Sequence, residues 1–195
     1  MQSIIPLEYG KVYHIYNRGI NRTIIFKDSE NYEYFLRLYY KYIDPVAESL
    51  AFCLLPNHFH FLVKIKDPVR VTEPRQGYLN PSQSFSNLFN AYAQAFNKKF
   101  KRTGGLFQRP FKRKCVMDEN YFSNLIFYIH NNPVKHGICD DLRDYPWSSY
   151  NIAVSFGKSK FQKDRIIGMF GGREAFIDFH KKEHSLEEVF NYLLE

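Results

Sequence analysis

Two histidines separated by a single residue are the first side chains in this sequence that could do chemistry. They are His58 and His60, within the run LLPNHFHFLV at residues 54–63. Successive side chains of a β-strand point to opposite faces, so both imidazoles would lie on one face and could bind one divalent ion. Phe59 and Phe61 would lie on the other face and anchor the strand in the core. The alternative, commoner for an isolated His-x-His pair, is two surface or hydrogen-bonded histidines.

A tyrosine and an asparagine four residues apart form a second candidate group. Tyr128 and Asn132 would lie on one face of a helix, one turn from each other. A tyrosine hydroxyl beside an amide, facing a metal held by two histidines, could cleave a phosphodiester: the metal polarises the phosphate and the phenolate attacks phosphorus. The chain has 15 tyrosines, so a core or interface role is the alternative for Tyr128. Asn132 precedes Pro133, and a turn-forming role is its alternative.

The positive charge of the chain is concentrated in one stretch. The sequence has 27 Lys and Arg against 20 Asp and Glu, a formal net charge of +7 that favours a polyanionic partner. Within it, residues 98–114 contain eight basic residues and no acid. A solvated charged face is the alternative, but the clustering favours contact with nucleic acid, with Phe107 and Phe111 available to stack on bases. The basic residues are Lys98, Lys99, Lys101, Arg102, Arg109, Lys112, Arg113 and Lys114.

Composition limits the class of protein. With 195 residues, 45% hydrophobic and 24% charged, the chain is neither disordered, collagen-like nor a coiled-coil rod. Three cysteines are too few and too scattered for a disulfide framework or a zinc cage. The N-terminus shows no signal-peptide pattern, and no apolar run approaches the roughly 20 residues that span a bilayer. We therefore expect a cytoplasmic protein that does not contact membranes.

The elements that must position these side chains follow from hydrophobic periodicity. Their order is strand, helix, strand, strand, helix, strand, which is the order of a ferredoxin-like α+β sandwich: one antiparallel sheet with helices packed on one side. A third helix follows and carries Tyr128. The expected elements are strand 12–16, helix 29–43 capped by Asp28, strands 50–55 and 58–65 joined by a tight turn, loop 67–81, a helix capped by Ser82 or Ser84 that runs to residue 100, strand 111–117, and a helix capped by Asp118 and stopped by Pro133.

The composition changes after Phe156, which divides the chain into a main domain, 1–156, and a C-terminal extension, 157–195. Residues 174–195 contain six acids and only two lysines, the wrong sign to bind phosphate. We expect this extension to be helical and to pack against the core or a partner subunit.

Five short motifs occur in one order within residues 9–156. They are Tyr13–Gly19 (YHIYNRG), Leu55–His60 (LPNHFH), Arg102–Gln108 (RTGGLFQ), Tyr128–Val134 (YIHNNPV) and Asp144–Tyr150 (DYPWSSY). Together they resemble the REP-associated tyrosine transposases, relatives of the single-tyrosine insertion-sequence transposases within the HUH endonucleases. Five ordered motifs make a chance match very improbable.

The resemblance implies a ferredoxin-like fold and metal-dependent cleavage of single-stranded DNA. Tyr128 would be the nucleophile, forming a covalent 5′-phosphotyrosine link and leaving a 3′-hydroxyl that can later rejoin the strands. His58, His60 and Asn132 would hold Mg²⁺ or Mn²⁺, with positions left for water and phosphate.

The resemblance also implies that several side chains hold the DNA, a hairpin with a neighbouring single strand. The protein would act as a monomer or a homodimer. The residues expected to bind DNA are His14, Arg18, Arg102, Arg109, Lys112, Arg113 and Lys114.

Three positions depart from the family pattern. Leu55 stands where methionine is usual and His136 where alanine is frequent, and we expect neither to contact the reacting groups. Pro110 replaces a common glycine in the basic stretch, which leaves the conformation of that loop undetermined.

Three functions remain open for these residues. The first is a transposase that nicks and rejoins a DNA strand through Tyr128. The second is a non-catalytic ferredoxin-like module that binds single-stranded or hairpin nucleic acid, although pure binding does not require the proposed ligands and nucleophile. The third is a metal-dependent hydrolase in which Tyr128 is structural and water attacks the phosphate.

Overall fold

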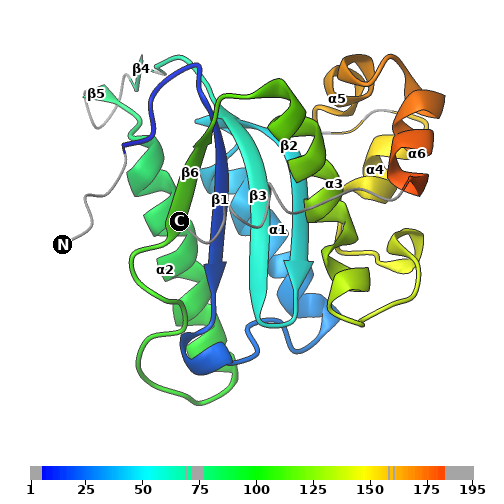
Figure 1. Ribbon diagram of the computed structural model, residues 1–195. Helices are drawn as coiled ribbons and strands as arrows, with labels where there is room; N and C mark the ends of the chain where they lie inside the picture. Colours follow the sequence, from blue (N-terminus) through cyan, green and yellow to red (C-terminus); the bar gives the residue numbers. More distant parts are fainter. Residues whose placement is uncertain (1–5, 69, 72–76, 158, 160, 183–195) are drawn as a thin grey trace.

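The computed structural model describes residues 6–68, 70–71, 77–157, 159 and 161–182. Four strands form one sheet in the order β2-β3-β1-β6, and every neighbouring pair is antiparallel (Figure 1). This is the strand order of the ferredoxin-like sandwich, so the expected fold class is confirmed. The strands are β1 (Val12–Arg18), β2 (Ala47–Leu55), β3 (His58–Ile65) and β6 (Lys112–Val116).

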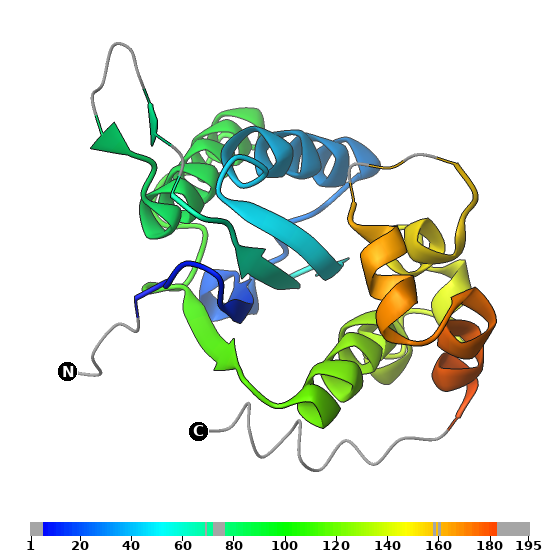
Figure 2. The same cartoon turned by 90° about the horizontal axis from the view of Figure 1, so that it is seen from above.

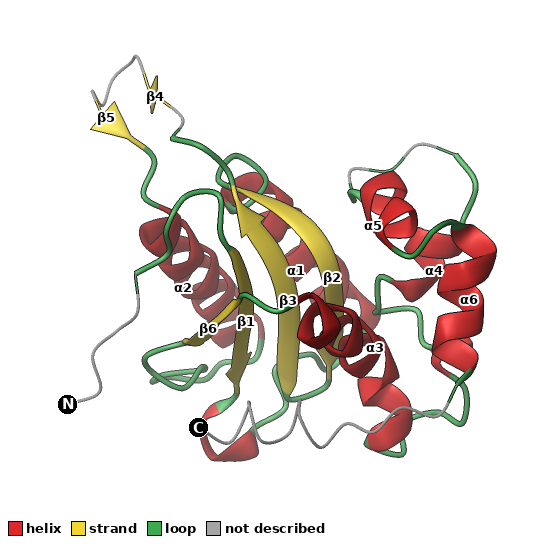
Figure 3. Ribbon diagram, turned by 45° about the horizontal axis from the view of Figure 1, so that its top comes forward, coloured by secondary structure: helices red, strands yellow, loops and turns green. Residues whose placement is uncertain are grey.

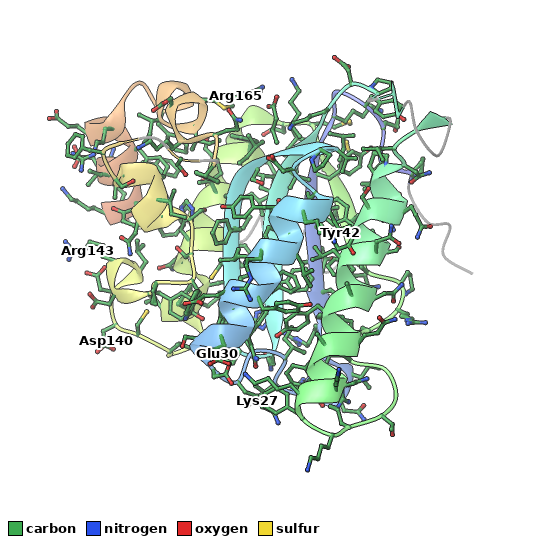
Figure 4. All side chains as sticks on the ribbon, turned by 180° about the vertical axis from the view of Figure 1, so that it is seen from behind. Lys27, Glu30, Tyr42, Asp140, Arg143 and Arg165 are labelled. Carbon is green, nitrogen blue, oxygen red and sulfur yellow. The ribbon has the colours of Figure 1, made fainter. Side chains whose placement is uncertain are left out.

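Two helices, α1 (Ser29–Tyr42) and α2 (Pro81–Lys99), cover one face of the sheet, as the views from above and from behind show (Figures 2 and 4). Asp28 caps α1 as predicted, accepting a hydrogen bond from the Asn31 amide at 2.9 Å. The predicted cap of α2 at Ser82 or Ser84 is wrong. Asn80 is the cap, because its side chain accepts from the Gln83 amide at 3.0 Å and the proline that follows is favoured in the first turn of a helix.

The core between these helices and the sheet is aromatic. Phe59 and Phe61 of β3 are fully buried, and the ring of Phe59 lies 5.3 Å from those of both Phe35 in α1 and Phe89 in α2. Because side chains alternate along β3, this packing directs His58 and His60 to the opposite face of the sheet. The alternation predicted from the sequence is confirmed.

A third long helix, α3 (Glu119–Lys135), lies on that opposite face, over β2 (Figure 1). Asp118 caps it as predicted, accepting from the Tyr121 amide at 2.8 Å. The prediction that Pro133 stops the helix is wrong, since α3 continues to Lys135. A proline removes only one backbone donor, and the bond from the His136 amide to the Asn132 carbonyl, 3.0 Å, closes the last turn.

The C-terminal part of the chain forms a group of short helices beside α3, on the side away from α2 (Figure 3). The helix predicted in the acidic segment is present as α6, and its Phe176 and His180 are buried. The rest of that segment, residues 183–195, lies outside the described residues. The helices of this group are η2 (Leu142–Asp144), α4 (Tyr150–Val154), α5 (Lys163–Met169) and α6 (Arg173–Lys181).

The remaining elements are short. A single 3-10 turn, η1 (Ile20–Arg22), follows β1. The predicted loop 67–81 contains a small antiparallel pair, β4 (Arg70–Val71) and β5 (Gly77–Tyr78). Among the helices of the described residues, none combines the length and the apolar character needed to cross a bilayer.

Candidate functional site

A cavity of about 370 Å³ opens on the face of the sheet that carries α3, where β1 ends and β3 begins. The antiparallel register pairs Tyr16 with His60 and Arg18 with His58, so the two central strands direct these four side chains to one face. The wall consists of Tyr16, Asn17 and Arg18 from β1, His58, Phe59 and His60 from β3, Gln108 and Lys112 from the basic stretch, and Tyr128, Lys135 and His136 from α3 and its C-cap.

Both histidines of the His-x-His motif are oriented by a hydrogen bond at Nδ1. The Nδ1 of His58 lies 2.6 Å from the Asn57 Oδ1, and the Nδ1 of His60 lies 2.9 Å from the His14 Nε2. The rings are nearly perpendicular, with centroids 5.3 Å apart. Neither Nε2 makes a hydrogen bond to any described residue. The Nε2 atoms are therefore the nitrogens that remain for a ligand.

Burial keeps these imidazoles neutral. It lowers the pKa of His58 to about 3, with the charge of Arg18 as a further cause. It also holds the pKa of His60 well below its usual value, helped by the neighbouring His14. Neutral imidazole is the form that binds a metal ion, so both side chains are in the ligating state at neutral pH.

Tyr128 lies directly against His60. The two rings are perpendicular with centroids 5.5 Å apart, and the Lys135 Nζ lies 5.1 Å from the centre of the tyrosine ring. Tyr128 is only 6% exposed, yet it forms part of the cavity wall. Burial raises the pKa of Tyr128, so the phenol keeps its proton in the resting protein. The structure thus brings Tyr128, His58 and His60 of a single chain together.

Asn132 is fully buried one helical turn after Tyr128. Its Nδ2 donates to the Tyr128 carbonyl at 2.7 Å, whereas its Oδ1 makes no hydrogen bond to the described residues. An unsatisfied buried acceptor costs about 1–3 kcal/mol, and a cation would satisfy it. Two imidazole nitrogens and an amide oxygen suit a divalent ion such as Mn²⁺ or Mg²⁺. Asn132 does not line the cavity that contains His58 and His60. In the described part of the chain, no three His, Cys, Asp or Glu side chains form a metal cluster, so an ion on the two imidazoles would need further ligands from Asn132, the substrate or solvent.

His14, which was expected to hold DNA, does not lie on the surface of the structure. Its side chain is fully buried, and its ring centroid lies 4.7 Å from that of Tyr16 and 5.1 Å from that of His60. Strand alternation places His14 on the same face as Tyr16 and His60, and the rings of these two residues pack against it. His14 instead contacts the ring of His60 through a hydrogen bond.

The cations expected to bind DNA are divided between the two faces of the sheet. Arg18 and Lys112 line the cavity, and Lys114 pairs with His14 in register on the same face. Arg113 lies on the other face, where it donates to the Ser82 Oγ of α2 at 2.8 Å. That Arg113 contacts DNA stays a prediction, but its side chain does not line the cavity that contains Tyr128.

Two further predicted contacts belong to the loop between α2 and β6. Arg102 donates to the Asn97 Oδ1 at 2.8 Å and to the Gly105 carbonyl at 3.2 Å, so it braces the loop. Arg109 is exposed. Phe107 and Phe111, which were predicted to stack on bases, are 6% and 8% exposed and pack in the aromatic core, and both also line a second cavity, so their stacking on a base stays a prediction. Burying such large apolar rings in the core stabilises the fold.

Two cavity residues were not predicted. His136 was expected to lie away from the reacting groups, but its ring lies 5.0 Å from that of His58. Lys135 lies against the ring of Tyr128. Helical periodicity could have indicated both, because positions seven and eight residues after Tyr128 lie on its side of a helix.

Comparison with known proteins agrees with this architecture. No family model matches the sequence. A protein of Haemophilus influenzae named as a REP-associated tyrosine transposase is 32% identical over 109 residues, which are 55% of this chain and 61% of that protein. The solved structure of a REP-associated tyrosine transposase bound to a REP hairpin superposes with a TM-score of 0.58 at 16% identity, covering 83% of this chain and 94% of that one. A bacterial tRNA(His) guanylyltransferase-like protein in complex with GTP gives a TM-score of 0.46 at 13% identity over 69% and 67% of the two chains.

Fold and site together define a ferredoxin-like α+β protein with a tyrosine and two neutral histidines on the face of the sheet opposite α1 and α2. Within that class, the resemblance to the REP-associated tyrosine transposases is confirmed by the sequence similarity to the H. influenzae protein, and the solved transposase shares the fold. The matched region spans 61% of the length of that curated relative.

Proposed function

We propose that this protein cleaves and rejoins single-stranded DNA through a covalent tyrosine intermediate. The observation that carries the proposal is the contact of Tyr128 with His60 inside a cavity that also contains His58, Arg18 and Lys112. The similarity to a protein named as a REP-associated tyrosine transposase supports the same function.

The Nε2 atoms of His58 and His60 and the Oδ1 of Asn132 would hold Mg²⁺ or Mn²⁺. When bound, such an ion stabilises the negative charge that develops on the phosphate oxygens. The chain prepares this site in two ways: burial keeps both imidazoles neutral, and the buried Asn132 Oδ1 accepts no hydrogen bond within the described part of the chain.

In the cleavage step, the Tyr128 oxygen attacks phosphorus. A bond forms between the tyrosine oxygen and phosphorus, the bond from phosphorus to the 3′-oxygen breaks, the phenolic proton is lost to solvent, and the leaving 3′-oxygen takes up a proton. Lys135 beside the tyrosine ring favours the phenolate, and Arg18 and Lys112 neutralise the phosphate. Rejoining is the reverse, with a 3′-hydroxyl attacking the phosphotyrosine and Tyr128 leaving.

The substrate we propose is single-stranded DNA next to a hairpin. The solved relative of the same fold is bound to a REP hairpin, which supports this choice. The cations of the basic stretch would neutralise phosphates and so supply most of the affinity. Because Tyr128 and both histidines come from one chain, we propose that a single copy forms the whole site and that a homodimer is not required.

Tyr128→Phe tests the proposal. The protein is incubated with an end-labelled hairpin oligonucleotide bearing single-stranded arms and Mn²⁺, and covalent adducts are resolved on a denaturing gel. We expect an adduct with the wild type and none with Tyr128→Phe. The matched control is Tyr16→Phe, since Tyr16 lines the same cavity and should not be the nucleophile.

The same gel, together with a native gel of the same mixture that detects binding, separates the alternatives. Binding without cleavage by the wild type would favour the non-catalytic module, and cleavage that survives Tyr128→Phe would favour a hydrolase that uses water. His58→Ala and His60→Ala should abolish cleavage while keeping most of the DNA affinity, because phosphate contacts dominate binding.

A further inference from the structure

A second cavity, of about 550 Å³, adjoins the first. It lies between α2 and the loop of residues 104–111, on the far side of Asn17 and Gln108 from Tyr128. These two residues line both cavities. A strand whose phosphate lies at His58 and His60 could therefore place a neighbouring nucleotide in the second cavity by running past Asn17 and Gln108.

We propose that this second cavity holds one unpaired purine base of the substrate strand and reads its identity. The inference rests on the proposed function for its substrate class, single-stranded DNA, but it concerns recognition rather than the chemical step. Its residues are Asn90 and Gln94 of α2, Arg109 of the loop, and an apolar floor that includes Phe89 and Phe111.

The groups at the rim match the edges of purines. Asn90 and Gln94 project from one side of α2 and make no hydrogen bond to described residues, and neither does the exposed Arg109. A carboxamide can donate to and accept from adenine N7 and N6, and a guanidinium can donate to guanine O6 and N7. Side chains that contact base edges carry sequence information, whereas contacts to phosphate do not.

The floor of the cavity suits the face of a base. Phe111 lies 5.3 Å from Phe89 between ring centroids, and the Arg113 guanidinium lies 3.9 Å from the centre of the Phe111 ring. Such apolar and cationic surfaces favour a flat π-system. A volume of about 550 Å³ also lies in the range of small-ligand sites.

The loop wall of the cavity is held in place before any ligand binds. The Asn97 Nδ2 donates to the Gly104 carbonyl at 2.9 Å, and its Oδ1 accepts from Arg102. At the other end of the loop, the Gln108 amide donates to the Arg18 carbonyl at 2.9 Å and the Asn17 Nδ2 donates to the Gln108 carbonyl at 3.2 Å. A preformed wall reduces the entropy lost on binding and favours discrimination between bases.

A binding selection tests the proposal. The probe is a synthetic DNA hairpin with randomised single-stranded arms, bound by the full chain in EDTA, and the bound and unbound pools are sequenced. We expect a purine to be enriched at one arm position by the wild type. Asn90→Ala and Gln94→Ala should each reduce that enrichment about 10-fold, the effect of one lost base contact, and leave other positions unchanged.

The matched control is Asn87→Ala, on the same helix but outside the cavity, where the Asn87 Oδ1 accepts from Gln83. It should enrich like the wild type. Absence of any enriched position, enrichment of a pyrimidine, or purine enrichment unchanged in the Asn90→Ala/Gln94→Ala double variant would overturn the proposal. The selection measures binding and needs no cleavage, so a missing tyrosine adduct would refute the proposed function without affecting this result.

Discussion

A chain of buried hydrogen bonds joins α6 to α3 and to the sheet. The Nδ1 of His180 lies 2.8 Å from the Phe176 carbonyl, the Nδ1 of His130 lies 2.9 Å from the His180 Nε2, and the Ser149 Oγ lies 2.8 Å from the His130 Nε2. A carbonyl only accepts, so the His180 Nδ1 donates to it, His130 donates to His180, and the serine hydroxyl donates to His130. Ser149 in turn accepts from the Phe52 amide of β2 at 2.8 Å.

Removing one of these buried hydrogen bonds should lower the free energy of unfolding. His180→Phe keeps an aromatic ring beside Phe176 but leaves the Nδ1–H of His130, which is fully buried, without an acceptor. The cost of one unsatisfied buried donor is about 1–3 kcal/mol. His130→Leu removes the donor to the His180 Nε2 and should cost a similar amount, while Ser149 can still donate to the Phe52 carbonyl at 3.3 Å.

The double variant gives the decisive measurement. With both partners replaced, no unsatisfied group is left at this bond, so the double variant should lose less than the sum of the single losses, by about 1–2 kcal/mol. Urea unfolding followed by the fluorescence of the single tryptophan, Trp147, measures all four proteins at neutral pH. Lys181→Ala, on an exposed part of α6, is the control and should unfold like the wild type. Additive losses would refute the hydrogen-bonded coupling of α6 to α3.

Two further predictions concern the buried histidines. The free energy of unfolding of the metal-free protein should fall as pH drops below about 6.5, by about 1.4 kcal/mol per pH unit for each histidine that only the unfolded chain can protonate. Burial holds the pKa of His14 and His58 at about 3 and that of His130 well below its usual value. The contribution of these neutral histidines to the free energy of unfolding is therefore fully present above the unfolded-state pKa and is lost on acidification. Equal free energies of unfolding at neutral and mildly acidic pH in urea titrations would contradict this. His14→Phe should weaken Mn²⁺ binding about 10- to 100-fold in calorimetry, because the hydrogen bond from His14 orients His60. The affinity for DNA should not change. Wild-type affinity for Mn²⁺ in this variant would show that His60 does not need this bond.

Local patterns were sufficient for the elements that present the site. Alternation along residues 58–65 placed both histidines on one face of a strand, and Asp28 marked the start of α1, because both signals act within a few residues of the backbone. The spacing of Tyr128 and Asn132 likewise placed them one helical turn apart. The same local rules gave the order of elements and hence the fold class.

The surroundings of individual side chains depended on contacts between distant segments. His14 has the sequence context of an exposed strand residue, but in the sheet its ring packs against those of Tyr16 and of His60 on the neighbouring strand, and it is fully buried. Arg113 and Lys112 are neighbours in the sequence, yet the strand turns one toward α2 and the other toward the cavity. Charge and residue type are properties of a position, whereas exposure is set by which strand pairs beside it and which helix covers it, and those packing partners come from far along the chain.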